Sequence, residues 1–326
     1  MTALHWGLLG AGGIARQFGR DCLQAGLSVS AIGSRSLDKA QAFARELGLE
    51  TAHGSYEALV SDPNLDIIYV ATPHPMHAEN AILAIEAGKH VLVEKSFTVN
   101  AAQARAIRDA ATANGVFAME AMWTRFLPSM LRIRQIVTSG QIGEVRTMEA
   151  THQQYLPYER APRLHEPELG GGSLLDLGIY PMSFFHYILG KPDQISASAT
   201  LTDLGVDEII ATTFDYSSGA KSVSLSGFMA AGPNTATIVG SDGRIEIDRV
   251  WYNQTSFSVL DRTGTLIARY EDKIDSRGMH FQALEVEDCI RSGKLQSEVM
   301  SLDESIEIME VMDEVRRQVG VRYPGE

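Results

Sequence analysis

Lys95 follows a short apolar run, Val91-Leu92-Val93, and one acidic residue, Glu94. A run that is bounded in this way and followed by a helical pattern is typical of a buried strand in a parallel sheet. Open α/β sheets bind their ligands beyond the carboxyl ends of the strands, so Lys95 stands where a catalytic or ligand-binding cation would be placed. A surface lysine that closes a strand is the simpler interpretation. The choice depends on which other residues converge on this position.

Asp176 and Tyr180 form the second pair whose spacing could support chemistry. They stand four residues apart in a segment, 173–189, that is predicted to be helical, so both side chains should project from one face. The neighbouring positions are mostly Leu, Ile, Met and Phe, which predicts a helix that is buried nearly all round. A buried tyrosine alone is common, but a buried carboxylate is costly unless it has a partner. Packing alone therefore does not explain the pair, which makes Asp176 and Tyr180 candidate functional residues.

Gly10, Gly12 and Ala15 form a G-x-G-x-x-A pattern between a predicted strand, 4–9, and a predicted helix, 14–25. Gly10 permits the tight turn, Gly12 lets the backbone approach a pyrophosphate, and Ala15 allows close packing of the helix on the strand. The amides that would face the anion belong to the first residues of the helix: Gly13, Ile14 and Ala15. Because the strand and helix flank the pattern correctly, it predicts a dinucleotide-binding turn.

The residues after the second predicted strand, 28–33, indicate which dinucleotide is bound. An NAD site carries Asp or Glu here, to hydrogen-bond the ribose 2′-hydroxyl. This chain has hydroxyl and basic side chains instead: Ser34, Arg35, Ser36 and Lys39. An arginine can hold a 2′-phosphate through two bonds, so the sequence favours NADP. An ordinary helix cap made by these residues would be compatible with either cofactor.

Thr72 and Pro73 follow the next predicted strand, 65–71, and His74 and His77 come shortly afterwards. Two histidines could suggest a metal site. Two prolines stand beside them, and no third ligand is in reach by sequence, so we assign no metal. We expect a loop that starts a helix above the cofactor, with Thr72, Pro73 and His77 lining the dinucleotide.

Strands and helices alternate up to about residue 121, which implies right-handed crossovers and a mostly parallel sheet. Beyond that point, short strands separated by turn signals run from 194 to 270, and two helical patterns end the chain. We predict an α/β dinucleotide-binding Rossmann domain over 1–121. We predict an α+β domain over 122–326 for substrate binding and dimerisation, with a large, mainly antiparallel open sheet.

One strand of the second half, 220–229, alternates between apolar residues and serines. One face of the sheet is therefore apolar there, and the other is small and polar. An antiparallel sheet with helices on one face leaves the other face available for self-association. We expect a homodimer formed through this sheet.

The composition excludes several classes of partner. The net charge is −13 and no cluster of Lys and Arg interrupts it, so nucleic-acid binding is not expected. No apolar run approaches the ~18 residues of a membrane helix, and the predicted strand at 4–9 leaves no room for a signal peptide. Cys22 and Cys289 are far apart, which argues against a disulfide scaffold or a thiolate metal site. We expect a soluble, cytoplasmic protein with a small-molecule substrate.

Over essentially its full length the chain resembles the Gfo/Idh/MocA family of NAD(P)-dependent sugar and polyol oxidoreductases. Four stretches carry the resemblance: Gly10-Ala11-Gly12-Gly13-Ile14-Ala15, Thr72-Pro73…His77, Ala87-Gly88-Lys89-His90-Val91-Leu92-Val93-Glu94-Lys95 and Gly171-Gly172…Asp176-Leu177-Gly178. Further stretches are similar to the branch of dimeric dihydrodiol dehydrogenases and NADP-dependent D-xylose 1-dehydrogenases: 119–126, 172–180 and Val319-Gly320-Val321…Pro324.

The resemblance implies hydride transfer between NADP and a sugar, at C1 of an aldose such as D-xylose, or a trans-dihydrodiol. It implies that Tyr180 is the base for the hydroxyl proton and that Lys95 is the cation that favours the ionised phenol. Asp176 would orient Lys95 or a substrate hydroxyl, and Glu94 would belong to the cofactor site.

The same resemblance implies three substrate residues: Trp123, Arg125 and His152. Trp123 would face the apolar side of the sugar and His152 its hydroxyls, although core packing is an equal alternative for Trp123. The chain departs from the family at Ser96, where Pro is usual, and from the branch at Gln282, where Glu is usual. Tyr180 agrees with the branch, whereas many other members carry His. These differences leave the reaction class intact and the substrate open.

Two alternatives stay open. The nearer one is a family enzyme for another sugar, a polyol or an inositol, or a reductase of a sugar ketone. The other, from a different class, is a non-catalytic NADP-sensing regulator on the same fold. The joint presence of Lys95, Asp176 and Tyr180 argues against the regulator, because a sensor does not need an acid–base set.

Overall fold

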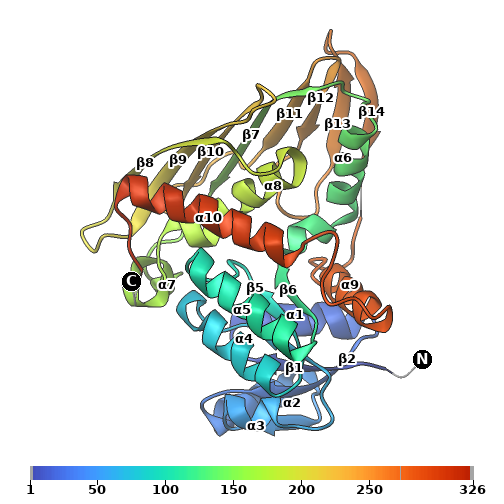
Figure 1. Ribbon diagram of the computed structural model, residues 1–326, viewed down its shortest axis with the longest axis vertical. Coiled ribbons are helices and arrows are strands. Elements are labelled where there is room, and N and C mark those ends of the chain that lie inside the picture. Colours follow the sequence, from blue (N-terminus) through green and yellow to red (C-terminus); the bar gives the residue numbers. More distant parts are fainter. Residues whose placement is uncertain (1–2, 272, 324–326) are drawn as a thin grey trace. The chain divides into compact units, whose positions relative to one another are not determined.

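The structure is a computed structural model that describes residues 3–271 and 273–323 (Figure 1). Pro324, which contributes to the family resemblance, lies outside the described residues. The chain divides into two compact units. The first contains the described residues up to Trp123 together with Asp275–Ile306. The second contains Thr124–Ile274 and the described residues from Glu307 onward.

A six-stranded parallel sheet forms the core of the first unit, in the order β3-β2-β1-β4-β5-β6. Its strands are β1 (His5–Leu9), β2 (Ser28–Gly33), β3 (Thr51–His53), β4 (Ile67–Val70), β5 (His90–Glu94) and β6 (Ala118–Ala121). β4 and β6 are buried at every position, as expected of strands that are covered on both faces. The sheet confirms the predicted Rossmann fold.

Five α-helices and a short 3₁₀ turn, η1 (His74–Met76), connect these strands. The helices are α1 (Gly13–Gln24), α2 (Leu37–Leu47), α3 (Tyr56–Val60), α4 (His77–Glu86) and α5 (Ala101–Asn114). Local signals set several of their ends. Ser36, Ser55 and Asn100 cap α2, α3 and α5 by accepting a bond from a backbone N–H three residues on. Gly48 and Gly115 end α2 and α5 in the left-handed conformation.

The segment Asp275–Ile306 packs with the first unit, whereas the sequence prediction assigned all of 122–326 to the second domain. Two buried hydrogen bonds hold it there, one just before helix α9 (His280–Arg291) and one within it. The backbone N–H of Met279 donates to Asp21 at 2.9 Å, and the indole of Trp6 donates to Glu287 at 2.9 Å. Contacts between residues so far apart in sequence leave no trace in local periodicity.

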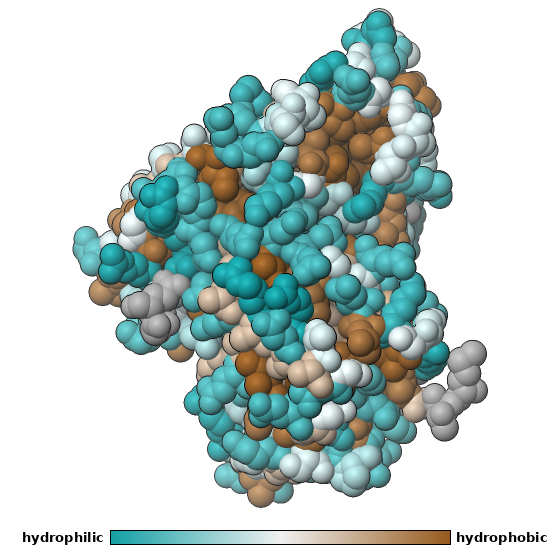
Figure 2. Space-filling model, in the orientation of Figure 1, coloured by the Kyte–Doolittle hydropathy of each residue, from teal (hydrophilic) through white to brown (hydrophobic). Residues whose placement is uncertain are grey.

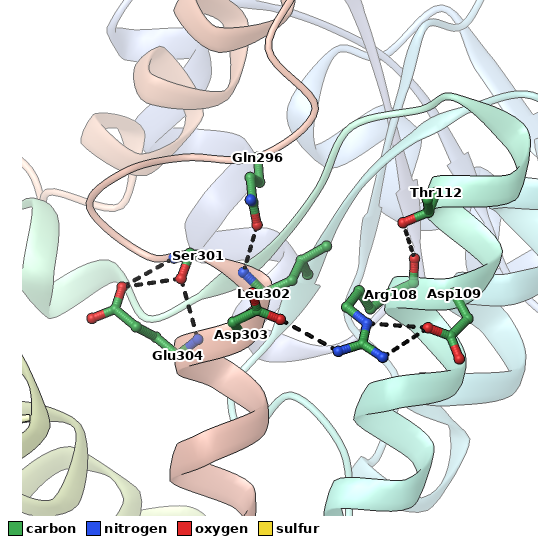
Figure 3. Close-up of polar contacts among 8 residues, drawn as sticks. All are labelled: Arg108, Asp109, Thr112, Gln296, Ser301, Leu302, Asp303 and Glu304. Carbon is green, nitrogen blue, oxygen red and sulfur yellow. Dashed lines mark hydrogen bonds and ion pairs between the residues drawn. The ribbon is translucent and has the colours of Figure 1, made fainter. Parts of the chain in front are cut away.

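The start of α10 (Leu302–Val319) also belongs to this unit (Figure 3). Ser301 and Glu304 form a capping box, in which the Ser301 hydroxyl accepts from the Glu304 N–H at 3.2 Å and the Glu304 carboxylate accepts from the Ser301 N–H at 3.2 Å. Arg108 on α5 donates to Asp303 at 3.3 Å. The capping box fixes where the helix begins, while the exposed ion pair adds little stability.

An eight-stranded sheet dominates the second unit, in the order β14-β13-β12-β11-β7-β10-β9-β8 (Figure 1). Its strands are β7 (Val145–Gln153), β8 (Gln194–Leu201), β9 (Asp207–Asp215), β10 (Lys221–Gly227), β11 (Ala236–Gly240), β12 (Gly243–Ile247), β13 (Phe257–Asp261) and β14 (Leu266–Tyr270). All neighbours pair antiparallel except β7 and β10, which are parallel. This confirms the predicted large, mainly antiparallel sheet.

The covered face of β10 is the polar one. Helix α8 (Ile179–Leu189) packs against β7 and β10, and the three serines of β10 are buried. Ser224 shares a hydrogen bond with Thr212 at 2.7 Å, which satisfies both hydroxyls. Val223, between the serines, is 46% exposed. The apolar residues of this strand therefore lie on the open face of the sheet.

The remaining helical segments of the second unit are η2 (Trp123–Phe126, which begins at the last residue of the first unit), α6 (Pro128–Thr138), α7 (Pro162–His165), η3 (Pro167–Leu169) and the π-helical turn η4 (Leu174–Gly178). Hydrophilic residues cover most of the molecular face in Figure 2. Within the described part of the chain, no helix combines the length and the apolar character needed to cross a membrane.

Candidate active site

The glycine-rich turn joins β1 to α1. Gly10 has a φ of +108°, and a Cβ there would lie 2.8 Å from the carbonyl oxygen of Ala71, so both its conformation and its contact with the end of β4 require glycine. Gly12 has a φ of −91°, which any residue adopts, and an added Cβ would come no closer than 4.0 Å to a neighbour. At Gly13 an added Cβ would meet nothing within 4 Å. Packing therefore does not explain glycine at 12 and 13, whereas a pyrophosphate against the first amides of α1 does.

This turn lies where the strand order of the sheet reverses. β1 stands between β2 and β4, so the crevice beyond their carboxyl ends is the switch point at which open α/β sheets bind dinucleotides. Gly10 follows β1, and Thr72 and Pro73 follow β4. The residues present thus fit a dinucleotide, with Ile14 half-buried in the first turn of α1.

The end of β2 carries the residues predicted to bind a 2′-phosphate. Ser34 is buried and its hydroxyl accepts from the Ser36 N–H at 3.3 Å, and Ser36 caps α2 through the Lys39 N–H at 3.4 Å. Arg35 and Lys39 are exposed. The Arg35 guanidinium hydrogen-bonds the hydroxyl of Tyr56, whose pKa is raised by burial against the opposing effect of Arg35. Ser36 therefore does serve as a helix cap, and the two cations beside it are available to a phosphate.

Two histidines hold the backbone around Lys95. The His77 ring places Nδ1 2.9 Å from the Ser96 carbonyl oxygen and Nε2 2.8 Å from that of Thr72. His74 Nε2 lies 3.3 Å from the carbonyl oxygen of Lys95. Because β4 and β5 are adjacent parallel strands, the two rings link the loops at their carboxyl ends. The peptide bond between Lys95 and Ser96, where the family usually has proline, is cis.

Two buried carboxylates support the same loop. Glu94 accepts from the Tyr69 hydroxyl and, at 3.1 Å, from the Lys95 N–H. Burial raises the pKa of Glu94, while the Tyr69 hydrogen bond and the Lys95 charge act in the opposite direction. On the neighbouring strand, Glu120 accepts from the Phe97 N–H at 3.1 Å. Sequence reasoning missed Tyr69 and Glu120, although an acidic residue inside a buried strand run was a usable signal for the second.

Trp123 is buried in the first unit, and the guanidinium of Arg277 lies 5.0 Å from the centroid of its ring. The charge of Arg277 also acts to lower the pKa of Glu94. Arg277 is exposed and was not among the predicted site residues. It adds a second cation to the surroundings of Glu94, beside Lys95.

In the second unit, Asp176 lies in the π-helical turn η4, which leads directly into α8 and Tyr180. The α-helical spacing assumed for this pair does not apply to the turn, and π turns of this kind occur often at functional sites. Asp176 accepts from Arg163 at 2.9 Å. Asp176 is mostly withdrawn from water, and α7 supplies a partner for its carboxylate that the sequence did not reveal.

Asp207, at the start of β9, holds the beginning of this turn. One carboxylate oxygen accepts from the Ser173 hydroxyl at 2.8 Å and from the Leu174 N–H at 2.6 Å. The residue is fully buried, and burial raises its pKa to about 6. Asp207 therefore acts as the cap of the helical segment that carries Asp176 and Tyr180.

The glycines before this segment allow these close approaches. Gly172 has a φ of +103°, and a Cβ there would lie 2.1 Å from Asp207 Oδ1. A Cβ on Gly171 would lie 2.7 Å from the carbonyl oxygen of Leu164 on α7. The Gly171-Gly172 motif is therefore explained by the carboxylate on one side and the α7 backbone on the other.

The rings of His152 and Tyr252 pack against the phenol of Tyr180. The His152 ring stacks on Tyr252 with centroids 3.7 Å apart, and it meets Tyr180 edge-on at 4.9 Å. His152 Nε2 lies 2.8 Å from the side-chain amide nitrogen of Gln154, which donates to it, so the ring proton is on Nδ1 and is donated to the Leu177 carbonyl at 3.1 Å. Both ring nitrogens of His152 thus have protein partners. Tyr252 and Gln154 are neighbours of the predicted site that sequence reasoning missed.

Arg125 lies in the core of the second unit. Its guanidinium donates to the Ser183 hydroxyl at 2.9 Å and to the Ser183 carbonyl at 3.0 Å. It also lies 4.9 Å from the centroid of the Tyr187 ring. Arg125 thus anchors the 3₁₀ turn η2 to α8, and its role toward a substrate stays a prediction.

The first unit supplies a dinucleotide cradle and a lysine at a strand end, and the second supplies a carboxylate, a phenol and their aromatic surroundings. No cluster of three or more His, Cys, Asp or Glu that could hold a metal ion occurs within 3–271 and 273–323. A parallel sheet with a glycine turn at its switch point is the arrangement of the dinucleotide-binding Rossmann class.

Family models agree with this class. The model described as "Oxidoreductase family, NAD-binding Rossmann fold" matches residues 4–122, and that of the "GFO/IDH/MocA C-terminal domain" matches residues 130–246. The chain belongs to the Gfo/Idh/MocA family of oxidoreductases.

Relatives and solved structures agree over the full length. A trans-1,2-dihydrobenzene-1,2-diol dehydrogenase from Danio rerio is 37% identical, with 98% of each chain covered. A D-xylose 1-dehydrogenase (NADP(+)) from Hypocrea jecorina is 36% identical, covering 98% of this chain and 93% of that one. The structure of KijD10, a 3-ketoreductase from Actinomadura kijaniata in complex with NADP and TDP-benzene, is similar with a TM-score of 0.85 and 25% identity, covering 99% of each chain.

Proposed function

We propose that this chain is an NADP-dependent dehydrogenase that moves a hydride between the nicotinamide and either C1 of an aldose, such as D-xylose, or a trans-dihydrodiol. One observation carries the proposal. Lys95, Asp176 and Tyr180 occur together in a chain that is 36% identical, over 98% of its length, to an NADP-dependent D-xylose 1-dehydrogenase. The dihydrodiol dehydrogenases, at a similar identity, make the diol the second candidate substrate.

NADP accepts or supplies the hydride when it is bound, and the residues of this chain hold and orient it. Those assigned to the cofactor are Gly10, Gly12, Gly13 and Ile14 for the pyrophosphate, Ser34, Arg35, Ser36 and Lys39 for the 2′-phosphate, and Thr72, Pro73, His77, Glu94 and Lys95 for the nicotinamide side. The unobstructed backbone at Gly12 and Gly13 supports the first set. The exposed cations after β2 support the second.

Tyr180 takes the hydroxyl proton as hydride leaves the substrate carbon. Lys95 supplies the positive charge that favours the ionised phenol, and Asp176 orients the groups around the reacting hydroxyl. Trp123, Arg125 and His152 are assigned to the substrate. The stacking of His152 on Tyr252 and its edge contact with Tyr180 support a role for this histidine in placing the phenol.

A substrate panel tests the proposal. Purified protein is mixed with D-xylose, other aldoses, polyols, inositol and a trans-dihydrodiol, each with NADP and with NAD, and formation of reduced nicotinamide is followed by absorbance. We expect turnover with an aldose or the diol in the presence of NADP. No turnover across the panel, with tight binding of NADPH, would favour a non-catalytic regulator instead.

Two substitutions test the acid–base assignment. Tyr180→Phe and Lys95→Met should each lower kcat by about 10³-fold, because the proton acceptor or its activating charge is lost. Binding of NADPH, measured by fluorescence, should stay close to that of the unmodified protein. Near-normal turnover by either variant would contradict its assigned role.

The cofactor preference has its own test. Arg35→Asp places a carboxylate where the 2′-phosphate would be held, so kcat/KM with NADP should fall and the preference for NADP over NAD should shrink or reverse. Lys39→Asp, on the next turn, should change it less. Equal use of both cofactors by the unmodified protein would contradict the proposal.

The open face of the large sheet supports a homodimer. Val223 and Leu225 lie there, opposite the small side chains of Thr213 and Ala211 on β9. Such an exposed apolar strand on a wide sheet is a common association surface. Light scattering should report twice the mass of the chain, and Val223→Glu should lower it. A monomer at micromolar concentration would contradict the dimer.

We propose the cytoplasm as the compartment. Cys22 and Cys289 are free and buried, which fits a reducing environment. Localisation of the full-length protein by fractionation tests this assignment.

A further inference from the structure

Arg163 is paired with the carboxylate to which the proposed function gives an orienting role. One of its terminal nitrogens lies 2.9 Å from Asp176 Oδ1. The Asp176 side chain is 16% exposed, and that of Arg163 is 36% exposed. The carboxylate is therefore mostly withdrawn from water, and its charge is compensated by a residue from a different segment of the chain.

Contacts on both sides of Arg163 fix the backbone, and this fixes the position from which its side chain reaches Asp176. Pro162 occupies the first turn of α7. Leu164 is buried in a cluster with Leu177, Val206 and Phe228. The carbonyl oxygen of Leu164 accepts from the Gly172 N–H at 2.8 Å.

A further contact holds the next residue. His165 Nε2 lies 3.1 Å from the carbonyl oxygen of Leu156, and its ring meets that of Phe228 at 4.8 Å. An arginine held between two anchored neighbours loses less conformational freedom when it pairs than an arginine on a mobile loop. The pair is thus better placed to act than an ordinary exposed ion pair.

The other acidic groups around this turn have partners of their own. Glu166 accepts from the Tyr158 hydroxyl at 3.1 Å. Asp207 on β9 is engaged by Ser173 and the Leu174 N–H. Among the elements packed against η4, β7 contributes the neutral His152 and α8 contributes Tyr180. Arg163 is thus a cation that the second unit directs at Asp176.

We propose that Arg163 is a positioning residue for the reaction: its guanidinium holds Asp176 in the orientation in which the carboxylate serves the site beside Tyr180. The inference rests on the proposed function. Removal of Arg163 takes a charge-assisted hydrogen bond away from a mostly buried carboxylate, which then turns toward water or samples other rotamers. Either change removes the oriented acceptor from the site while leaving the dinucleotide-binding unit untouched.

Substitution of Arg163 and a matched control test the proposal. Arg163→Met should lower kcat by about 10²-fold, as expected when a reacting group is misplaced by about an ångström, with the KM for NADP unchanged. Arg163→Lys should recover part of the loss. Arg160→Met is the control, because Arg160 lies on the same loop and donates to the Tyr155 carbonyl instead; it should retain kcat within about twofold.

Chemical rescue separates positioning from a merely structural role. Guanidinium ion, added at millimolar concentration, should raise the turnover of Arg163→Ala and leave that of Arg160→Ala and the unmodified protein unchanged. A fold-supporting arginine would show no such rescue. Normal kcat in Arg163→Met, together with normal turnover by the unmodified protein, overturns the proposal and leaves the proposed function intact.

A double-mutant cycle shows whether Arg163 acts through Asp176. In an Asp176→Asn background, Arg163→Met should cost nothing further in kcat or in Tm. Losses that add in both measurements would overturn the proposal, because Arg163 would then act independently of Asp176. The cycle in Tm needs no turnover, so it tests the pairing even if the substrate panel shows that the proposed function fails.

Discussion

The two units hold their reactive side chains in different ways. In the first, Lys95 follows a strand of a parallel sheet, and the loop around it is bonded to His74, His77, Glu94 and Glu120. These partners come from three neighbouring strand ends, all of them buried. Several hydrogen bonds therefore share in stabilising the conformation of this loop.

In the second unit, the described supports of the segment that carries Asp176 and Tyr180 include a carboxylate that caps the turn and an arginine from a loop. A buried carboxylate, Asp207, caps the turn, and one arginine from a proline-rich loop pairs with Asp176. The parallel sheet brings several strand ends to one edge, so supports accumulate there. In the open sheet, a loop supplies the arginine that pairs with Asp176. The close contacts of this region require glycine at positions 171 and 172.

Gly172→Ala should have the largest effect on stability, because it disturbs the contact with Asp207, the carboxylate that caps the turn. The new Cβ would lie 2.1 Å from Asp207 Oδ1 at a φ of +103°. We expect a loss of about 3–5 kcal/mol in the free energy of unfolding from the clash and the left-handed backbone together. Urea unfolding followed by circular dichroism measures it.

Gly205→Ala separates the two causes of that loss. Gly205 has a φ of +82°, and an added Cβ there would meet nothing within 4 Å. Its substitution should therefore cost only the backbone term, about 1–2 kcal/mol. Equal losses at the two positions would show that the approach of Asp207 does not matter.

His77→Phe tests the other region, where supports are numerous. The substitution leaves the buried carbonyl groups of Thr72 and Ser96 without their donor, which should cost about 2–4 kcal/mol. Only the doubly protonated ring can donate to both carbonyls at once. His77→Gln, which keeps one amide donor group, should lose less stability.

The effect of His77→Phe on turnover bears on the comparison directly. Because His74, Glu94 and Glu120 still bind the loop, kcat should fall by about tenfold or less at a temperature well below Tm, against about 10²-fold for Arg163→Met. If His77→Phe lowered kcat more than Arg163→Met, the first region would be the more fragile one, and the comparison would be reversed.

Much of the fold could be predicted because local signals and burial agree. The strands expected over 28–33 and 90–95 are found at Ser28–Gly33 and His90–Glu94, since apolar runs between turn residues have few other uses in an α/β chain. The glycine-rich turn between β1 and α1 could also be predicted, because both its backbone conformation and the spacing of its glycines restrict the sequence. The assignment to a fold class therefore needed no tertiary information.

The supports of the site could not be predicted in the same way. Arg163 stands in a polar loop with three prolines, and only the folded α7 directs it toward Asp176. The π-helical turn η4 has the same apolar composition as an α-helix, so periodicity does not reveal it. The attachment of Asp275–Ile306 to the first unit depends on long-range bonds such as that between Trp6 and Glu287. Partners set by tertiary contacts leave little signal in a single sequence.

Asp207 should affect stability in a way that depends characteristically on pH. Burial raises its pKa from 3.8 to about 6, so the folded state binds more protons than the unfolded state between these values. The contribution to stability is therefore fully present below pH 3.8 and is lost as the pH rises through 6, by at most about 3 kcal/mol. Asp207→Asn, which cannot ionise, should gain stability relative to the unmodified protein over this window. Urea unfolding of both proteins from acidic to neutral pH measures the difference, and parallel curves would show that the carboxylate is already compensated, so that the second unit is as well supported as the first.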